Sequence, residues 1–564
     1  MAPVRPLSVT DIVVASAAIF LVHRIVKHYR SRSNRGNATP LGGPPSNSRI
    51  FGLTKELQTS EDVGKIYEDW AVEYGSVYKI PTIFGREKIM ILDPKAISHF
   101  YSKETFVYVG TPLQRKALTP AFSNAAIRRL TAVFYDSAYK VLSLNATNQS
   151  ETDARLFLPP SESQLKTHWD AKLENYPDGD IIEVQEWMNH VALDSIGIAG
   201  FSHDFGSLDG KPSAVVDAFE SLGQTPPSKL GLIIFLLSFV FPSLMSMPTR
   251  RNKRLMELKR SMGEIADELL ERSRKGDLGA DDKSIIGLLS EWCLPADEDI
   301  SLPFRRAVVK AENTQQDGDL HMTPEEVLAQ NVLLLAGYET TSISLTWALI
   351  ELSKAPEKQD QLRKELLETK NGQDAEWDDL MAADKYPYLD AVVHEILRLH
   401  PPLVETNRVS SEPDVIPLST PLLTKHGESV TSIAIPTGVH ISAPISCMNR
   451  SELVWGKRAK DFIPERWIGE GEGEDVIPAS AKEIQAYRHL LTFSDGPRTC
   501  LGKNFALAEF KSVLSVLIKN YRFEFPDGVD GKDTKIVTAR GILPRPKVEG
   551  SVGPNIPLRV RRVE

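Results

Sequence analysis

The stretch "FSDGPRTCLG" surrounds one cysteine, Cys500, with residues that suit a flat and partly anionic ligand. The cysteine stands just before a predicted helix, "LGKNFALAEFKSVLSVLIKN", and a helix amino terminus stabilises the thiolate form that binds metals. Gly496 and Gly502 allow the backbone to come close to a flat ligand. Phe493 can shield the sulfur, and Arg498 can reach an acidic group. A lone cysteine is more often an inert core residue, so it is these neighbours that favour a ligand.

The 564-residue chain contains only three cysteines, Cys293, Cys447 and Cys500, and they lie far apart in the sequence. This count is too small for a disulfide framework or a four-thiolate cluster, and an odd number suits a reducing compartment. If Cys500 binds a metal, it is therefore the only sulfur ligand. The net charge of −9 provides no global basic field, so we expect no nucleic-acid partner.

The longest well-delimited helix is predicted to begin at Thr323, where "TPEE" forms a capping box, and to end before Pro356. It would be about 45 Å long, and it is apolar on nearly every side, which predicts a place in the core. Its centre, "AGYETT", allows two interpretations. In one, Gly337 is a packing notch and Glu339 faces solvent. In the other, Gly337 admits a ligand, and Thr340 bonds back to the carbonyl four residues earlier and bends the helix, so that an acid and an alcohol lie over a buried pocket.

A second predicted helix, "YLDAVVHEILRLHPP", places Glu395 and Arg398 on one face. Taken alone, such a pair is most simply a surface ion pair. The apolar setting and the later "FIPERW", which offers Arg466, favour a buried glutamate between two arginines. Such a group would fix the geometry of the chain rather than do chemistry.

Helical patterns dominate the rest of the chain, and strand-like runs are short, near Val77, Lys88 and Val439. The predicted fold class is therefore mainly α with small β-sheets. The globular body, residues 51–564, is expected to form a single domain.

Residues 1–30 are predicted to be a membrane anchor, and residues 31–50 a basic hinge rich in proline and glycine. The unbroken apolar run, Ile12–Val22, is short for a span, so a cleaved signal peptide and a buried helix remain open as alternatives. Basic residues follow the run more often than they precede it. The positive-inside rule then places the body in the cytosol.

Four motifs, in this order along the chain, resemble those of the cytochrome P450 family: an oxygen-activation motif at Ala336–Thr341, an E-x-x-R pair at Glu395 and Arg398, a P-E-R-W segment at Pro464–Trp467, and the haem-binding signature around Cys500. The resemblance covers about residues 45–550. It is greatest to the microsomal and fungal members.

The resemblance implies a cytochrome P450 fold and a haem whose axial ligand is the Cys500 thiolate. Glu339 and Thr340 would deliver protons to bound oxygen. The remaining roles are also those of the family. Haem contacts are implied for Arg498, Arg408, Arg115, Phe493, Gly496 and Gly502, and a structural triad for Glu395, Arg398 and Arg466.

The implied activity is that of a monooxygenase that receives electrons from NADPH-cytochrome P450 reductase and inserts one atom of O2 into a lipophilic small molecule. The fungal character suggests secondary metabolism, for example of a terpenoid. The implied location is the endoplasmic reticulum membrane, with a single span and a cytosolic catalytic domain. A peroxide-dependent peroxygenase or isomerase, and a degenerate non-catalytic haem protein, are the alternatives.

The segment after Gly110 departs from the family pattern because it is short. Arg115 can take the role of a propionate-binding arginine, but Thr111 stands where the family carries Trp or His. Either a real deletion or an error in the gene model would explain this. A real deletion favours the non-catalytic alternative.

Overall fold

The computed structural model describes residues 38–46, 48, 50–60, 62–103, 122–139, 169–170, 172–174, 176–201, 203–210, 253, 260, 331–469, 476–526, 534–539, 543–551 and 553–563. The predicted anchor, Cys293, Arg115 and the short segment after Gly110 lie outside these residues. The chain divides into two compact units. The first unit comprises Met1–Val109, Val404–Lys460 and Ile477–Thr499, and the second comprises Gly110–Leu403, Asp461–Val476 and Cys500–Glu564.

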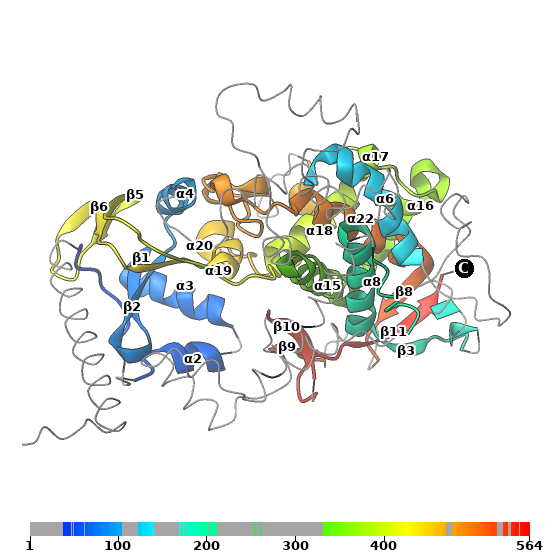
Figure 1. Ribbon diagram of the computed structural model, residues 1–564, viewed down its shortest axis with the longest axis horizontal. Coiled ribbons are helices and arrows are strands. Elements are labelled where there is room, and N and C mark those ends of the chain that lie inside the picture. Colours follow the sequence, from blue (N-terminus) through cyan, green and yellow to red (C-terminus); the bar gives the residue numbers. More distant parts are fainter. Residues whose placement is uncertain are drawn as a thin grey trace, which may run out of the picture. The chain divides into compact units, whose positions relative to one another are not determined.

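The first unit contains a four-stranded sheet in the order β1-β2-β7-β4 and a two-stranded sheet of β5 and β6 (Figure 1). Its strands are β1 (Val77–Pro81), β2 (Glu87–Ile91), β4 (Thr406–Val409), β5 (Asp414–Leu423), β6 (Ser429–Ile435) and β7 (His440–Ala443). Its α-helices are α2 (Thr54–Thr59), α3 (Val63–Tyr74), α4 (Pro94–Ser102), α19 (Ile445–Arg450), α20 (Glu452–Trp455) and α21 (Ala479–Lys482). Short 3-10 helices lie at η2 (Ile83–Gly85), η7 (Tyr487–His489) and η8 (Gly496–Arg498).

Side-chain caps explain where two helices of the first unit begin. The Asp62 carboxylate accepts a hydrogen bond from the Lys65 amide at 3.1 Å and caps α3. Asp93 caps α4 in the same way, and Pro94, which lacks an N–H, occupies the first helical position. The strands predicted near Val77, Lys88 and Val439 are confirmed as β1, β2 and β7.

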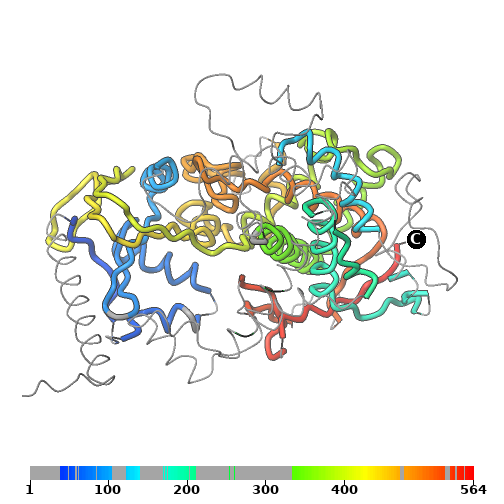
Figure 2. The backbone as a smooth tube through the Cα atoms, viewed as in Figure 1, coloured from blue at the N-terminus to red at the C-terminus, as the bar shows by residue number. Residues whose placement is uncertain are grey.

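The second unit is mostly helical. Its helices are α6 (Asn124–Tyr139), α8 (Val184–Phe201), α15 (Asn331–Lys354), α16 (Pro356–Glu368), η5 (Thr369–Gly372), α17 (Trp377–Met381), α18 (Pro387–Leu399), η6 (Pro464–Trp467) and α22 (Lys503–Asn520). Its strands are β3 (Asp180–Glu183), β8 (Tyr521–Glu524), β9 (Ile536–Ala539), β10 (Arg545–Val548) and β11 (Pro557–Arg562). In Figure 2 the last strand, β11, lies between β8 and the much earlier β3, and it pairs antiparallel with both.

The core of the second unit forms where α15 packs against α8 and α22. Apolar side chains of α6, α8, α15, α17 and α22 share one buried cluster that includes Phe134, Ile196, Tyr338, Trp377, Phe505 and Ala508. The segment Leu333–Lys354 is long and apolar enough to cross a membrane, but 67% of it is buried inside the protein. It is therefore the core helix that the apolar pattern predicts.

A neighbouring helix provides the cap of α18. Pro387 occupies its first position, and the Glu365 carboxylate of α16 accepts hydrogen bonds from the amides of Tyr388 and Leu389 at 2.7 and 2.8 Å. These amides lie in the first turn and have no partner within their own helix. The cap thus links α16 to the helix that carries Glu395.

The predicted fold class, mainly α with small sheets, is confirmed. The long helix ends at Lys354, before Pro356, as predicted, whereas its predicted start lies outside the described residues. Gly337 is a packing notch. A Cβ atom there would lie 2.7 Å from Cγ1 of Ile196 on α8, so the interpretation in which a ligand fills this notch is wrong.

Gly337→Ala should lower the thermal unfolding midpoint, because the added methyl group overpacks the contact with Ile196, at a cost of about 1–3 kcal/mol. In an Ile196→Ala background the same substitution should become stabilising by up to about 1 kcal/mol, since only the better helix propensity of alanine remains. A double-mutant cycle of unfolding midpoints measures this reversal of sign. If Gly337→Ala changed the unfolding midpoint equally in both backgrounds, the packing of Gly337 against Ile196 would not explain its effect.

Candidate functional site

Cys500 is exposed and precedes the first turn of α22 by three residues. Cys447, the other cysteine in the described part of the chain, is only 2% exposed. Burial, together with the negative charges of Glu68 and Asp62, raises the pKa of its thiol. Burial lowers the pKa of Lys503 in the first turn of α22, and the charge of Cys500 opposes this shift. Of these two cysteines, only Cys500 is placed to act as an accessible thiolate.

Gly496 has a φ of +64°, and a Cβ atom there would lie 2.3 Å from the Tyr101 carbonyl oxygen. This position therefore needs glycine, because its backbone is left-handed and packs on the end of α4. Gly502 caps α22 with a φ of −82°, which other residues can adopt. Phe493 is half-buried and lies edge-on to Tyr487, with ring centroids 6.1 Å apart.

Arg408, on β4, is buried, and its Nη1 donates a hydrogen bond to the Phe100 carbonyl at 2.7 Å. The guanidinium lies over the rings of Phe100 and Tyr101, at 4.6 and 5.2 Å from their centroids. Burial lowers the pKa of Arg408, and the positive charge of Arg498 lowers it further. Arg408 and Arg498, which both belong to the first unit, are thus close enough to repel each other, and this favours an anionic group beside them.

The Thr340 hydroxyl donates a hydrogen bond to the Ala336 carbonyl, as predicted. Ala336 is exposed and Thr340 is partly exposed, whereas the following residues, 341–346, are all buried. The predicted oxygen-activation motif of α15 is therefore partly accessible, directly before a buried stretch of the same helix. The helix remains continuous from Asn331 to Lys354 through this bond.

Glu339 is only 2% exposed, so the interpretation in which it faces solvent is wrong. Its Oε1 pairs with the Arg545 guanidinium at 3.2 Å. Burial raises the pKa of Glu339, although the charge of Arg545 and the Leu543 amide oppose the shift. Its Oε2 is buried and accepts no hydrogen bond within the described part of the chain. Sequence reasoning missed Arg545, because a single arginine between two prolines carries no recognisable signal.

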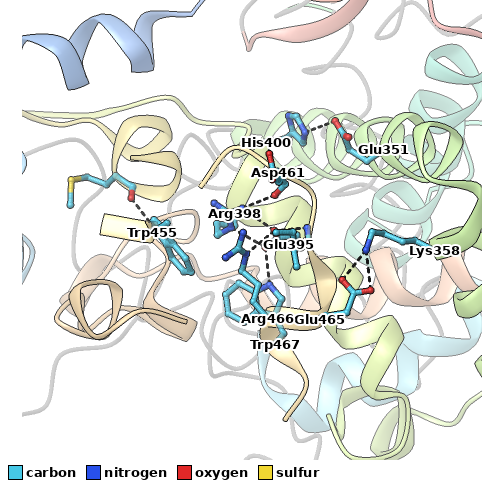
Figure 3. Close-up of polar contacts among 12 residues, drawn as sticks. Glu351, Lys358, Glu395, Arg398, His400, Trp455, Asp461, Glu465, Arg466 and Trp467 are labelled. Atoms are coloured by element: carbon cyan, nitrogen blue, oxygen red, sulfur yellow. Dashed lines mark hydrogen bonds and ion pairs between the residues drawn. The ribbon is translucent and has the colours of Figure 1, made fainter. Parts of the chain in front are cut away.

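Glu395, Arg398 and Arg466, the predicted triad, meet in the second unit (Figure 3). Both oxygens of Glu395 bind Arg398, at 2.8 Å each, and Oε1 also accepts from Arg466 Nε at 3.1 Å. The Ile463 amide and the Trp467 indole donate to the same carboxylate at 2.9 and 3.0 Å. All three charged side chains are completely buried or nearly so.

This network explains why Glu395 remains charged without contact to water. Burial alone would raise its pKa, but Arg398 and Arg466 hold the pKa of Glu395 below its ordinary value. The surface interpretation of the Glu395–Arg398 pair is therefore wrong. The indole of Trp467 was not predicted as a partner, although it belongs to the quoted P-E-R-W segment.

Within each unit, the chemistry of these residues is compatible with a haem that has a cysteine ligand. Of the expected residues, the first unit contains Arg408, Phe493, Gly496 and Arg498, and the second contains Glu339, Thr340, Cys500 and Gly502. The sulfur is accessible, the two arginines suit propionates, and the Thr340 face of α15 is open. Arg115 lies outside the described residues.

Comparison with known proteins gives matches along the whole chain. The family model for Cytochrome P450 matches residues 42–549. The chain is 51% identical to the cytochrome P450 monooxygenase claP of Ampulloclitocybe clavipes, with all of both chains covered. It is 29% identical to cytochrome P450 monooxygenase 205 of Postia placenta over 88% of each chain, and 28% identical to the ganoderic acid synthetase CYP5150L8 of Ganoderma lucidum over 92% and 93%.

The alignment with claP runs over 592 positions, about 28 more than the 564 residues of this chain. The relative therefore carries positions that this chain lacks. This agrees with a shortened segment somewhere along the chain.

Glu395→Gln should lower the stability of the protein by about 3–5 kcal/mol, because it leaves two buried arginines without their compensating charge. Thermal unfolding of the purified protein measures the loss. Haem retention during gel filtration should fall in parallel.

Lys358→Met is the matched control, because it also removes one partner of an ion pair in the second unit (Figure 3). The side chains of Lys358 and Glu465 are 21% and 41% exposed, so this pair should contribute only about 0–1 kcal/mol. Similar losses in the two variants would show that the burial of Glu395 has been overvalued.

Proposed function

The chain belongs to the cytochrome P450 family, and from this premise we propose that it is a membrane-bound monooxygenase of fungal secondary metabolism. Membership makes it an oxidoreductase with a haem held by a cysteine thiolate. Cytochrome P450 monooxygenases that are 51% identical to it over the full length make it a monooxygenase. We propose, in addition, the roles of its residues, its electron donor, its location and the class of its substrate.

The accessible thiol of Cys500 is the observation that carries the proposal. This thiol lies beside a helix amino terminus, whose positive potential stabilises a thiolate, whereas burial disfavours a thiolate at Cys447. Cys500 is therefore the iron ligand. The bound haem supplies the redox chemistry that activates O2.

Arg408 and Arg498 hold the haem propionates. Arg408 is fixed in advance by its bond to the Phe100 carbonyl and by two aromatic rings, so little side-chain entropy is lost when an anion binds. Arg115 is assigned the same role from its place in the family pattern. Phe493 shields the sulfur from water, and Gly496 fixes the turn that leads to the cysteine.

Thr340 and Glu339 would control the delivery of protons to the haem site. The hydroxyl of Thr340 lies on the accessible face of α15, and the buried Glu339 keeps one oxygen free of hydrogen bonds within the described residues. Because Arg545 holds the other oxygen, proton transfer from solvent requires this ion pair to loosen. One oxygen atom of O2 enters the substrate, and the other leaves as water with electrons from NADPH and protons from solvent.

The substrate is a lipophilic small molecule, the class on which members of this family act. We assign this substrate to secondary metabolism, because relatives of this chain come from fungi and one of them is named ganoderic acid synthetase. NADPH-cytochrome P450 reductase provides the electrons.

Residues 1–30 anchor the protein in the endoplasmic reticulum membrane, residues 31–50 form a hinge, and residues 51–564 form the catalytic domain in the cytosol. The charge difference across the apolar run Ile12–Val22 supports this topology, because Arg24, Lys27, Arg30, Arg32 and Arg35 all follow it.

Cys500→Ser should abolish the red-shifted Soret band of the reduced carbon monoxide complex, because an alcohol does not replace the thiolate ligand. In microsomes that contain the reductase, the native protein should form oxygenated products with consumption of NADPH and O2. Untargeted product analysis identifies them, with Cys500→Ser as the inactive control.

Two other outcomes would overturn the proposal. Turnover with peroxide alone, without any use of NADPH, would indicate the peroxide-dependent alternative. A normal Soret band without products from any substrate pool would indicate a non-catalytic haem protein.

Deletion of residues 1–35 should move most of the protein from the microsomal pellet to the supernatant, because the anchor and its basic flank are lost. A matched variant that keeps residues 1–35 but replaces the five basic residues with Gln tests the topology separately. Protection of the body from protease inside sealed microsomes would contradict a cytosolic catalytic domain.

A further inference from the structure

Glu509 is a carboxylic acid in the middle of α22 for which the mechanism above has no use. Its side chain is 0% exposed, and neither of its oxygens makes a hydrogen bond with the residues that the structure describes. A charged carboxylate in such a place is strongly disfavoured, because it loses its hydration and gains no cation. Burial raises the pKa of Glu509 to about 8.

Two buried hydroxyl groups, on α8 and α15, lie near this carboxyl. Ser195 on α8 and Thr341 on α15 lie close enough to lower the pKa of Glu509, against the larger effect of burial. Both hydroxyls are buried, and neither meets the geometry of a hydrogen bond with a described residue. Hydroxyl hydrogens and the acid proton can rotate, so small adjustments suffice to join the three groups.

The surroundings of these three groups are apolar. Ile196 and Ala508, their neighbours in sequence on α8 and α22, belong to the buried cluster that also contains Tyr338 and Phe505. These apolar neighbours offer no other hydrogen-bonding partner to Glu509, Ser195 and Thr341. The three polar groups therefore depend on one another.

No charged group contributes to the pKa shift of Glu509. The buried charged groups on its own helix and on the helices packed around it have other partners. Lys511 binds Asp390, Arg363 binds the Ile518 and Tyr521 carbonyls, Asp194 accepts from the Ser207 and Leu208 amides, Glu339 binds Arg545, and Glu395 binds Arg398. On α6 and α17 the exposed Arg128 binds Asp378.

Thr341 connects this cluster to the accessible face of α15. It follows Thr340 directly, and it lies one helical turn after Gly337, which packs on Ile196 of α8. Residues four apart share a helix face, so Gly337 and Thr341 both belong to the face that contacts α8. Any rotation of α15 that loosens Thr341 also turns Thr340.

We propose that Glu509 is a neutral acid in the folded protein and a positioning residue, which through the hydroxyls of Ser195 and Thr341 fixes the rotation of α15 that presents Thr340. The neutral acid donates its proton to one hydroxyl and accepts a hydrogen bond from the other. An ionised carboxylate can only accept, so loss of the proton breaks one bond of the set. The inference rests on the role proposed above for Thr340.

Infrared spectroscopy of the holoenzyme tests the neutral acid. The native protein at neutral pH should show the carbonyl stretch of a protonated carboxyl that is absent in Glu509→Gln and shifted in Thr341→Val. The band should disappear as the pH rises through about 8. Glu365→Gln is the matched control, because Glu365 is a carboxyl of the same unit that binds backbone amides instead, so the Glu509 band should survive there.

The carbon monoxide stretch of the reduced complex tests the positioning role, because it responds to polar groups beside the bound gas. The Thr340→Ala variant shows how much the Thr340 hydroxyl shifts the carbon monoxide stretch. The native stretch should shift as the pH passes about 8, and this shift should be absent in Glu509→Gln and reduced in Thr341→Val and Ser195→Ala.

A pH-dependent stability gives a readout that does not depend on haem spectra. The folded pKa of Glu509 lies above its ordinary value of 4.5, so the folded protein binds more protons between 4.5 and about 8. The stability that this group contributes is complete below 4.5 and is lost as the pH rises through about 8. The unfolding midpoint of the native protein should therefore fall over this window relative to that of Glu509→Gln.

The outcomes separate this inference from the proposed function. If the native protein lacks the thiolate-type Soret band, the proposed function fails. If the Soret band is normal but the native protein has no carboxyl band that Glu509→Gln removes, or if both proteins show the same pH-dependent carbon monoxide stretch, the role of Glu509 is refuted. Should Glu509→Gln not fold, Thr341→Val and Ser195→Ala decide the same points.

Discussion

The burial of Glu395 is the constraint on which much of the second unit depends. A carboxylate without access to water must find cations and donors, and this one finds them on its own helix, α18, on η6 and on the residue before η6. Arg398 and Arg466 are therefore as constrained as the acid. Because the segment around η6 is bound at one charged centre, its course is determined by electrostatics as well as by apolar packing.

Two other buried glutamates of this unit, Glu339 and Glu509, are stabilised in different ways. Glu339 lies in the long apolar helix α15 and is paired with Arg545, so a single ion pair stabilises its charge. No described cation contributes to the pKa of Glu509, and burial raises this pKa, which favours the neutral acid. Three buried glutamates thus show three electrostatic states. These states follow from the neighbours that the fold provides and not from the residue type.

In the first unit, Arg408 is a buried positive charge with a fixed position. Arg408 is held by the Phe100 carbonyl and by two aromatic rings, and no described carboxylate contributes to the shift of its pKa. An arginine prepared in this way, with Arg498 close by, is suited to an anionic group that comes from outside the protein. Gly496, which packs on the end of α4, fixes the backbone turn just before Arg498.

The sequence by itself determined the chemistry of the protein and the identity of its elements. Prolines and periodicity are local properties, so α18, α22 and the end of α15 could be predicted, and Cys500 could be singled out as a candidate ligand from its immediate neighbours. Tertiary structure alone decided what lies beside each buried group. Arg545 stands about two hundred residues from Glu339, and Ser195 comes from a helix far from both Thr341 and Glu509. Burial and contact between distant segments set pKa values and packing, and these have no signature within any short stretch of sequence.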